Sequence, residues 1–196
     1  FDRYLSFHNY KFKNENNECG GYVILKNKNF ILSADLGSSP EKKFSNDYQS
    51  GSLSFEIFFN NCKLISNCGY FQNYKHQLNS ISKSTATHST LVLDNYSSCN
   101  YKKDSDGIFK IDQGLKILKK SVISEKKYWN ISGSHDGYIK KYGVIHERKI
   151  EFFIEKNKLI GTDKLIKKKK FKSSNFEIRF HFEPGVKITK TQDEKS

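Results

Sequence analysis

The chain has 196 residues, which is enough for one domain with a sizeable hydrophobic core. Its formal net charge is +13, so a polyanionic partner is favoured over a cationic one. Arginine occurs only at Arg3, Arg148 and Arg179, and because bidentate contacts to phosphates and base edges depend on arginine, this composition argues against nucleic-acid recognition.

The apolar residues are those of a β-protein. The chain has 16 Phe and 11 Tyr but no Met, and aromatic and β-branched side chains pack well on a pleated sheet. No apolar run approaches the roughly 20 residues that cross a bilayer, and the chain shows no signal peptide. Since the chain opens on Phe1, we expect residues 1–196 to be a single, incomplete domain of a longer protein.

The four cysteines are spaced neither as a Cys-x-x-Cys pair nor as metal ligands. They are Cys19, Cys62, Cys68 and Cys99. Their even number permits disulfides in an oxidising compartment, but the sequence selects no pairing, and we prefer reduced thiols.

The first third of the chain predicts an edge strand or connection followed by two hairpins. Apolar runs are separated there by short turns rich in Asn and Lys, which is the pattern of a hairpin. In chain order the segments are residues 1–20 (edge strand or connection), 22–25 and 30–35 (first hairpin), and 52–58 and 63–66 (second hairpin).

The middle of the chain carries a polar corner that leads into a strand. Residues 84–94 read S-T-A-T-H-S-T-L-V-L-D, so small hydroxyl residues surround His88 before an apolar run enters the core. Residues 70–82 predict a loop. Residues 108–130 are loosely helix-spaced, but Gly114 interrupts them and we prefer short strands.

The β pattern continues towards the C-terminal end. Further strands are predicted at residues 149–154, 158–160, 163–166 and 176–182. The four lysines at 167–170 indicate a solvated hairpin tip. Short, regularly spaced strands without amphipathic helices between them predict an all-β, antiparallel β-sandwich.

Four histidines are candidates for chemistry because imidazole titrates near neutral pH. His88 stands at a strand entrance, where it either bonds the nearby backbone or faces a cleft. His135 lies in S-H-D-G-Y, which is either a functional site or simply a capped turn. In a site, Tyr138 would offer a stacking face or a phenolic donor. His146 lies inside a predicted strand. His181 alternates with two Phe residues, so a cleft wall and the solvent side are both open to it.

Five blocks of residues follow one another in a characteristic order and spacing. They are G-S-L-S-F-E-I from Gly51, N-C-G from Asn67, S-T-A-T-H-S-T-L-V-L-D from Ser84, S-H-D-G-Y from Ser134 with G-V-I-H-E-R from Gly143, and R-F-H-F-E-P-G-V from Arg179. Together they resemble the C-terminal β-domain of the heparinase II/III-like family, over roughly residues 20–196.

The resemblance implies a polysaccharide lyase in which an N-terminal α/α toroid, absent from this chain, packs against the β-sandwich. Such lyases cleave uronate-containing polysaccharides by β-elimination: a base removes the C5 proton, the neighbouring carboxylate is neutralised, and a Tyr or His completes the acid–base transfer. Most of that machinery lies on the toroid. The sandwich then supplies a cleft wall, with His88 and His135 as candidate catalytic residues and Tyr138, His146 and Gln49 as candidate substrate-binding residues.

The resemblance also implies a zinc site in some family members. They carry His-x-His ahead of the L-S-F-E strand, an Asp near the end of the next strand, and the His of the T-A-x-H segment. The corresponding positions here are Asp47, Gln49, Asn67 and His88. Because Zn²⁺ selects imidazole, thiolate and carboxylate ligands, this set predicts no bound zinc, and we expect no cofactor.

The leading hypothesis is a lyase that acts on acidic, heparin/heparan- or alginate-like polysaccharide. By family resemblance it works in the cell envelope or periplasm, with the toroid domain of the same chain as partner and without a membrane span. The sandwich alone is expected to be inactive. The alternative hypothesis is a non-catalytic glycan-binding or structural β-module. A third, nucleic-acid binding, lacks any recognisable motif.

Overall fold

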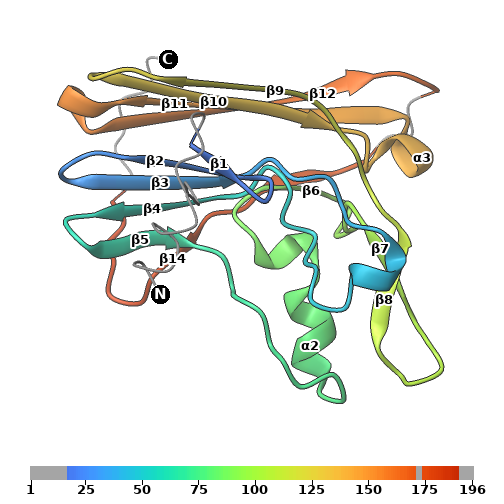
Figure 1. The fold of residues 1–196 in the computed structure, drawn as a ribbon. Coiled ribbons are helices and arrows are strands. Elements are labelled where there is room, and N and C mark those ends of the chain that lie inside the picture. Colours follow the sequence, from blue (N-terminus) through green and yellow to red (C-terminus); the bar gives the residue numbers. More distant parts are fainter. Residues whose placement is uncertain (1–16, 171–173, 190–196) are drawn as a thin grey trace, which may run out of the picture.

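Two antiparallel β-sheets lie face to face and form a sandwich (Figure 1). The computed structural model describes residues 17–170 and 174–189. The six-stranded sheet has the spatial order β1 (Glu18–Cys19), β2 (Tyr22–Lys26), β3 (Phe30–Asp35), β4 (Phe55–Phe59), β5 (Cys62–Ser66) and β14 (His181–Phe182). The four-stranded sheet has the order β12 (Lys158–Lys167), β11 (Val144–Phe153), β10 (Tyr128–His135) and β9 (Ile117–Ser124). The predicted all-β, antiparallel sandwich is confirmed.

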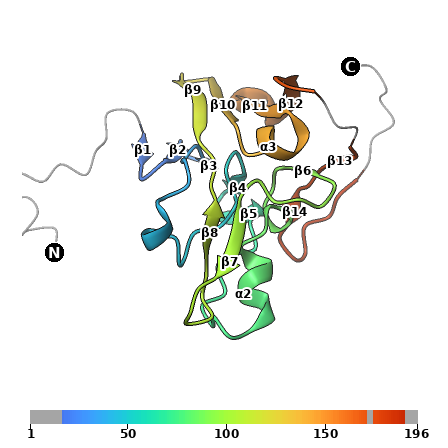
Figure 2. The same ribbon diagram turned by 90° about the vertical axis from the view of Figure 1, so that its right-hand side faces the viewer.

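Smaller elements complete the fold. They are β6 (Leu91–Leu93) paired with β13 (Phe176–Ile178), β7 (Asn100–Lys103) paired with β8 (Phe109–Gln113), helices α2 (Gln77–Ser82) and α3 (Ile139–Tyr142), and 3₁₀ turns at Lys42–Phe44, Thr85–Thr87 and Ile154–Lys156. Helix α2 and the β7–β8 hairpin project from one end of the sandwich, and α3 lies at the same end of the four-stranded sheet (Figures 1 and 2).

Asparagine residues set the tight turns of the six-stranded sheet. Between β2 and β3, Asn27 Oδ1 accepts the backbone N–H groups of Asn29 at 2.9 Å and Phe30 at 2.7 Å. Between β4 and β5, Asn60 and Asn61 have φ values of 47° and 63°. Asn tolerates this left-handed region because its short polar side chain can bond locally. Both predicted hairpins are therefore confirmed, but the strand predicted at 52–58 begins only at Phe55, because Leu53 has a left-handed φ of 64°.

The main hydrophobic core lies between the two sheets and takes alternate residues from each strand. Aromatic rings meet across it: the ring centroids of Phe152 and Phe30 are 4.7 Å apart, and those of Phe152 and Trp129 are 5.6 Å apart. The other buried members are Val23, Leu25, Leu32, Ala34, Leu36, Leu53, Phe55, Ile57, Ile131 and Ile150. This alternation leaves the opposite face of β2, β3 and β4 free to line a cleft.

A second, smaller core joins β6 to the end of the four-stranded sheet. Leu91 and Leu93 pack with Tyr138, Tyr142 and Val144. The Tyr138 hydroxyl donates to the Leu91 carbonyl at 3.0 Å and the Tyr142 hydroxyl to the Leu93 carbonyl at 3.4 Å. This core anchors β6, and with it the polar corner that precedes β6.

Three local predictions are corrected. The predicted loop at residues 70–82 ends in helix α2, which begins where His76 Nδ1 accepts the N–H of Leu78 at 3.2 Å. Residues 158–166 belong to one continuous strand, β12, which stays paired with β11 throughout. The predicted strand at 176–182 divides between sheets, because β13 pairs with β6 whereas β14 pairs with β5.

Other predictions are confirmed or lie outside the described residues. Strands β8 and β9 confirm the short strands expected between residues 108 and 130. Residues 167–170 are exposed, as predicted, but they do not form a hairpin tip, because β12 pairs with β11 whereas β13 pairs with β6. Residues 1–16 of the predicted first segment are outside the described ranges, and β1 is an edge strand.

Two further observations bear on the class of protein. Over residues 17–170 and 174–189, no helix combines the length and apolar composition that a membrane crossing needs. The four cysteines are free thiols, of which Cys99 is buried and the other three are exposed.

Gly133 on β10 leaves the space into which Leu53 and Leu36 pack. A Cβ at Gly133 would lie 2.6 Å from Leu53 Cδ2 and 2.9 Å from Leu36 Cδ2. We expect Gly133→Ala to lower the free energy of unfolding by about 1–3 kcal/mol, the usual cost of overpacking, as measured by urea denaturation.

The matched control is Gly161→Ala on β12, where no atom of the described residues lies within 4 Å of the new Cβ. This substitution is expected to change the free energy of unfolding by less than about 0.5 kcal/mol. Equal losses for the two variants would contradict the packing described for Gly133.

Candidate functional site

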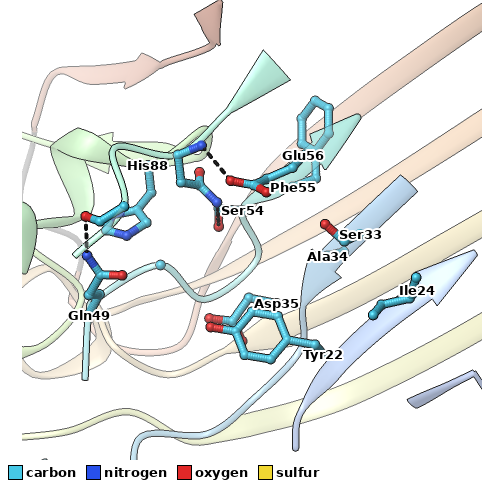
Figure 3. Close-up of a pocket in the computed structure, with 13 residues that line it drawn as sticks. Tyr22, Ile24, Ser33, Ala34, Asp35, Gln49, Ser54, Phe55, Glu56 and His88 are labelled. Carbon is cyan, nitrogen blue, oxygen red and sulfur yellow. Dashed lines mark hydrogen bonds between the residues drawn. The ribbon is translucent and has the colours of Figure 1, made fainter. Parts of the chain in front are cut away.

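A cleft opens on the outer face of the six-stranded sheet, on the side away from the core (Figure 3). Its volume is about 320 Å³. Strands β2, β3 and β4 form one part of it, and loops from neighbouring segments form the rest. The polar side chains that line it are Tyr22, Ser33, Asp35, Gln49, Ser54, Glu56, Asn67 and His88.

His88 brings an imidazole ring to this cleft directly after the 3₁₀ turn Thr85–Thr87. Its Nδ1 lies 2.8 Å from the carbonyl oxygen of Ser84. Because a carbonyl oxygen only accepts hydrogen bonds, Nδ1 carries the hydrogen and the neutral ring has its lone pair on Nε2. Among the described residues no hydrogen bond is made to Nε2. Burial lowers the pKa of His88, which the bond to Ser84 partly opposes, so the ring is a neutral acceptor at pH 7.

Gly51 provides the space for the His88 ring. A Cβ on Gly51 would lie 2.7 Å from Cδ2 and 3.2 Å from Nε2 of His88, so a larger residue would displace the imidazole. Gln49 lies on the same side of the cleft (Figure 3) and donates its two amide hydrogens to the carbonyls of Gly69 at 2.7 Å and Ser82 at 2.8 Å. The amide oxygen of Gln49 is therefore the part left for a ligand.

Tyr22 and Asp35 line another part of the cleft as cross-strand neighbours (Figure 3). Burial raises the pKa of Asp35 to about 6, although the N–H of Gly37 donates to its Oδ1 at 2.8 Å and opposes this. Burial, and the nearby carboxylates of Asp35 and Glu56, raise the pKa of Tyr22, so its phenol stays a proton donor. Neither residue stands out in the sequence, and the predicted turn at 26–29 would have paired Tyr22 with Ser33; the observed register, in which Lys26 pairs with Ile31, brings Tyr22 opposite Asp35.

Hydrogen bonds and an ion pair with neighbouring residues fix the side chains of Glu56 and Asn67 in the cleft wall. Glu56 Oε1 accepts the N–H of Asn67 at 2.9 Å and pairs with Lys63 Nζ at 3.3 Å. Asn67 Oδ1 accepts the N–H of Ser89 at 2.8 Å, and Nδ2 donates to Ser54 Oγ at 3.2 Å. Asn67 thus ties the segment that carries the imidazole to the strands beside it.

A second cluster of titratable groups lies inside the sandwich, on the inner face of the four-stranded sheet. Arg148 donates from Nε and Nη2 to the two carboxylate oxygens of Asp163 at 2.8 and 2.9 Å. His146 Nε2 lies 2.6 Å from Asp163 Oδ1, and His146 Nδ1 lies 3.2 Å from His135 Nε2. The N–H of Gly137 donates to His135 Nδ1 at 3.1 Å. All four side chains of this cluster are buried.

These bonds define a single arrangement of hydrogens for two neutral rings. Since Gly137 donates to His135 Nδ1, the hydrogen of His135 is on Nε2 and is donated to His146; the hydrogen of His146 is then on Nε2 and is donated to Asp163. Burial lowers the pKa of both imidazoles. Burial alone would raise the pKa of Asp163, but hydrogen bonds from His146 and Arg148 outweigh it and lower that pKa to about 2.

The structure separates the residues that the sequence groups into one site. Of the predicted site residues, Gln49 and His88 line the cleft. His135, Tyr138 and His146 are 1 %, 0 % and 0 % exposed, and both nitrogens of each of these two imidazoles are bonded within the protein. His88 is also largely buried, at 3 % exposed, but it lines the cleft, whereas Tyr138 and His146 do not. Their burial away from the cleft corrects the expectation that Tyr138 and His146 face substrate. It also excludes direct substrate contact by His135 in this arrangement.

Residues 16–196 match the protein family described as Heparinase II/III-like, C-terminal. The chain belongs to this family. The resemblance inferred from the five sequence blocks is thereby confirmed. No curated protein matches the chain.

Two solved structures share the fold of this heparinase II/III-like domain. A heparan sulfate lyase HepC mutant from Pedobacter heparinus aligns with a TM-score of 0.55 and 18% identity, over 76% of this chain and 21% of that chain. The heparinase III BT4657 gene product with methylated lysines aligns with a TM-score of 0.50 and 14% identity, over 74% of this chain and 20% of that chain. The chain therefore spans about a fifth of the length of these two structures.

The zinc positions implied by the family resemblance hold unsuitable groups. Asp47 is exposed and accepts a hydrogen bond from the Tyr74 hydroxyl at 3.0 Å. Gln49 has donated both amide hydrogens, and the amide of Asn67 is bonded at both ends. Across the described parts of the chain, no three His, Cys, Asp or Glu side chains are grouped as a metal site requires. These residues do not fit a zinc ion, and the expectation of no bound zinc stays a prediction.

Metal analysis of the purified, folded protein should accordingly find zinc well below one equivalent. The positive control is the triple variant Asp47→His, Gln49→His and Asn67→Asp, which supplies the ligand types that the resemblance implies and should raise the zinc content. A full equivalent of zinc in the unsubstituted protein, removed by His88→Ala, would refute the prediction.

The buried histidines make the free energy of unfolding depend on pH. Below about pH 6.5 the imidazoles of an unfolded chain bind protons, whereas burial lowers the pKa of His88, His135 and His146 in the folded chain. The unfolded state then binds more protons, so the free energy of unfolding should fall as the pH drops below about 6.5.

Asp35 changes the free energy of unfolding with pH in the opposite direction, so its effect must be removed by substitution before the histidines are measured. Its raised pKa of about 6 lets the folded chain bind the extra proton, so its contribution is lost as the pH rises towards 6. Urea denaturation of Asp35→Asn between about pH 5 and 8 should therefore show stability declining on the acid side. A profile that is flat in this variant would rule out neutral, buried imidazoles.

Proposed function

We propose that this domain forms one wall of the substrate cleft of a polysaccharide lyase that cleaves uronate-containing acidic polysaccharide, heparin/heparan- or alginate-like, by β-elimination. In this proposal an α/α toroid of the same protein forms the opposite wall, and the protein works in the cell envelope or periplasm. The observation that carries the proposal is the geometry of His88, which lines the cleft with 3 % of its surface exposed, while Nδ1 is fixed on Ser84 and no hydrogen bond from the described residues reaches Nε2.

The chemistry needs a proton acceptor and a proton donor near the scissile bond. In β-elimination the C5 proton passes to a base, the C4–oxygen bond breaks as the C4=C5 double bond forms, and the leaving oxygen takes up a proton. His88 is suited to accept a proton or a hydroxyl hydrogen bond, because its pKa is lowered and Nε2 carries the lone pair. Tyr22 is suited to donate, because its raised pKa keeps the phenol protonated.

The charges of this wall explain why it would need a partner. The net charge of +13 favours encounter with a uronate polymer, but the charged side chains that line the cleft are the carboxyl groups of Asp35 and Glu56. Glu56 is paired with Lys63. The group that neutralises the substrate carboxylate in the transition state would therefore come from the opposite wall.

The second candidate function is a non-catalytic glycan-binding or structural module. The exposed ring of Tyr22, 53 % accessible in the cleft, favours this alternative because sugars stack on aromatic faces. The amide groups of Gln49 and Asn67 at positions where the resemblance implies zinc ligands point the same way.

The two functions are distinguished by assaying the full-length protein on heparin, heparan and alginate and following the ultraviolet absorbance of the unsaturated uronate product. We expect the wild type to produce it and His88→Ala to lower kcat by at least about 100-fold, the lower range for loss of an acid–base group. The control is His76→Ala, which removes an imidazole that caps α2 outside the cleft; it should retain activity.

Three outcomes would change the assignment. Binding of these polymers without product formation favours the module. Unchanged turnover in His88→Ala would show that His88 is not the group that acts on substrate. Product formation by the sandwich alone, assayed in parallel, would refute the need for an opposite wall.

A further inference from the structure

Arg148 joins the two chain segments that surround His88. Its Nη1 donates to the carbonyl oxygens of Leu53 at 3.1 Å and Ser89 at 2.7 Å. Ser89 directly follows His88, and Leu53 lies two residues after Gly51, which is packed against the imidazole. The Arg148 guanidinium on β11 therefore bonds both the segment that packs against the His88 ring and the segment that carries His88.

The backbone of Leu53, whose carbonyl bonds Arg148, is in the left-handed conformation. Its φ of 64° lies in the left-handed region, which is unfavourable for a residue with a Cβ. Such conformations persist where the surrounding structure imposes them, and they gather at functional sites. Leu53 donates its N–H to the Asp35 carbonyl at 2.7 Å, offers its own carbonyl to Arg148, and buries its side chain against Gly133. The segment next to Gly51 is thus held at three points.

Asp163 and the two buried histidines orient Arg148. The carboxylate takes hydrogens from both Nε and Nη2, so the plane of the guanidinium is fixed and Nη1 is directed at the two carbonyls. His146 donates to the same carboxylate and is itself bonded to His135. Through this shared carboxylate, the two histidines contribute to the orientation of Arg148.

We propose that Arg148 and Asp163, oriented by the His135–His146 pair, are positioning residues that hold the imidazole of His88 at the edge of the cleft. The consequence for turnover rests on the proposed function, whereas the positioning itself does not. Without the contacts from Nη1, Leu53 and Ser89 lose a shared anchor and the ring is free to shift. A misplacement of about 1 Å can lower a rate by up to about 100-fold.

The test uses the full-length protein with two conservative substitutions. Asp163→Asn keeps an acceptor for His146 but removes the charge and one arm of the fork. Arg148→Lys keeps the charge but cannot bond the carboxylate and both carbonyls together. Amide hydrogen exchange is measured on peptides covering residues 51–54 and 87–90, and kcat and KM are measured on the polymer that the wild type cleaves.

Both variants should exchange these two segments at least about tenfold faster than the wild type, as expected when a local opening becomes easier. Their kcat should fall by about 10- to 100-fold while KM stays within about twofold, because the group is displaced and not removed. The matched control is Phe152→Leu, which loses core packing against Phe30 and Trp129 but no bond to the His88 segments. It should change neither the exchange of residues 51–54 and 87–90 nor kcat.

Wild-type exchange rates in both variants, or an equal rise in Phe152→Leu, would overturn the positioning role. Faster exchange with unchanged kcat would overturn its consequence for turnover. A wild type that cleaves none of the polymers would defeat the proposed function alone, and the exchange rates would still decide the positioning. If neither variant folds, the wild type provides the test: residues 51–54 and 87–90 should exchange as slowly as β11, and faster opening of these segments would overturn the proposal.

Discussion

The buried ion pair of Arg148 and Asp163 is the interaction on which the arrangement of this domain depends. Moving both charges out of water is unfavourable unless their hydrogen-bonding groups are satisfied. Here four N–H groups of Arg148 are used, two on Asp163 and two on backbone carbonyls, and Asp163 also accepts from His146. Removing one partner of such a pair leaves a buried charge, which costs on the order of 3–5 kcal/mol. These bonds connect strand β11 of the four-stranded sheet to the segments around Leu53 and Ser89, next to His88.

The same side chain has two different roles in this domain. Both nitrogens of His135 and of His146 are bonded inside the protein. The two imidazoles therefore form a chain of hydrogen bonds from Gly137 to Asp163 and have no nitrogen left to bind a ligand. His88 has Nδ1 bonded to Ser84 and lines the cleft. Among the described residues, the cleft is lined by the carboxyl groups of Asp35 and Glu56 and by no Lys or Arg.

Periodicity and turn chemistry were sufficient to predict most of the sheets. The alternation around residues 52–58 and the Asn-rich turns predict strands and hairpins because both depend on neighbours along the chain. Ordered blocks of residues led to the family, and the small residues around His88 indicated a tight polar corner. The sequence alone was therefore enough to predict the fold class and the family, and it offered His88 as one of several candidate histidines.

Only the folded structure shows which of the candidate histidines lines the cleft, because alternation gives the face of a strand but not what packs on that face. His146 and Arg148 point the same way from β11, and only the register with β12 brings Asp163 beside them. The left-handed conformation of Leu53 is likewise imposed by contacts from distant segments. Residues 176–182 look like one strand, yet they divide between two sheets because two different edges are open to pair with them. Each of these outcomes depends on residues far apart in the chain, whose proximity no local pattern records.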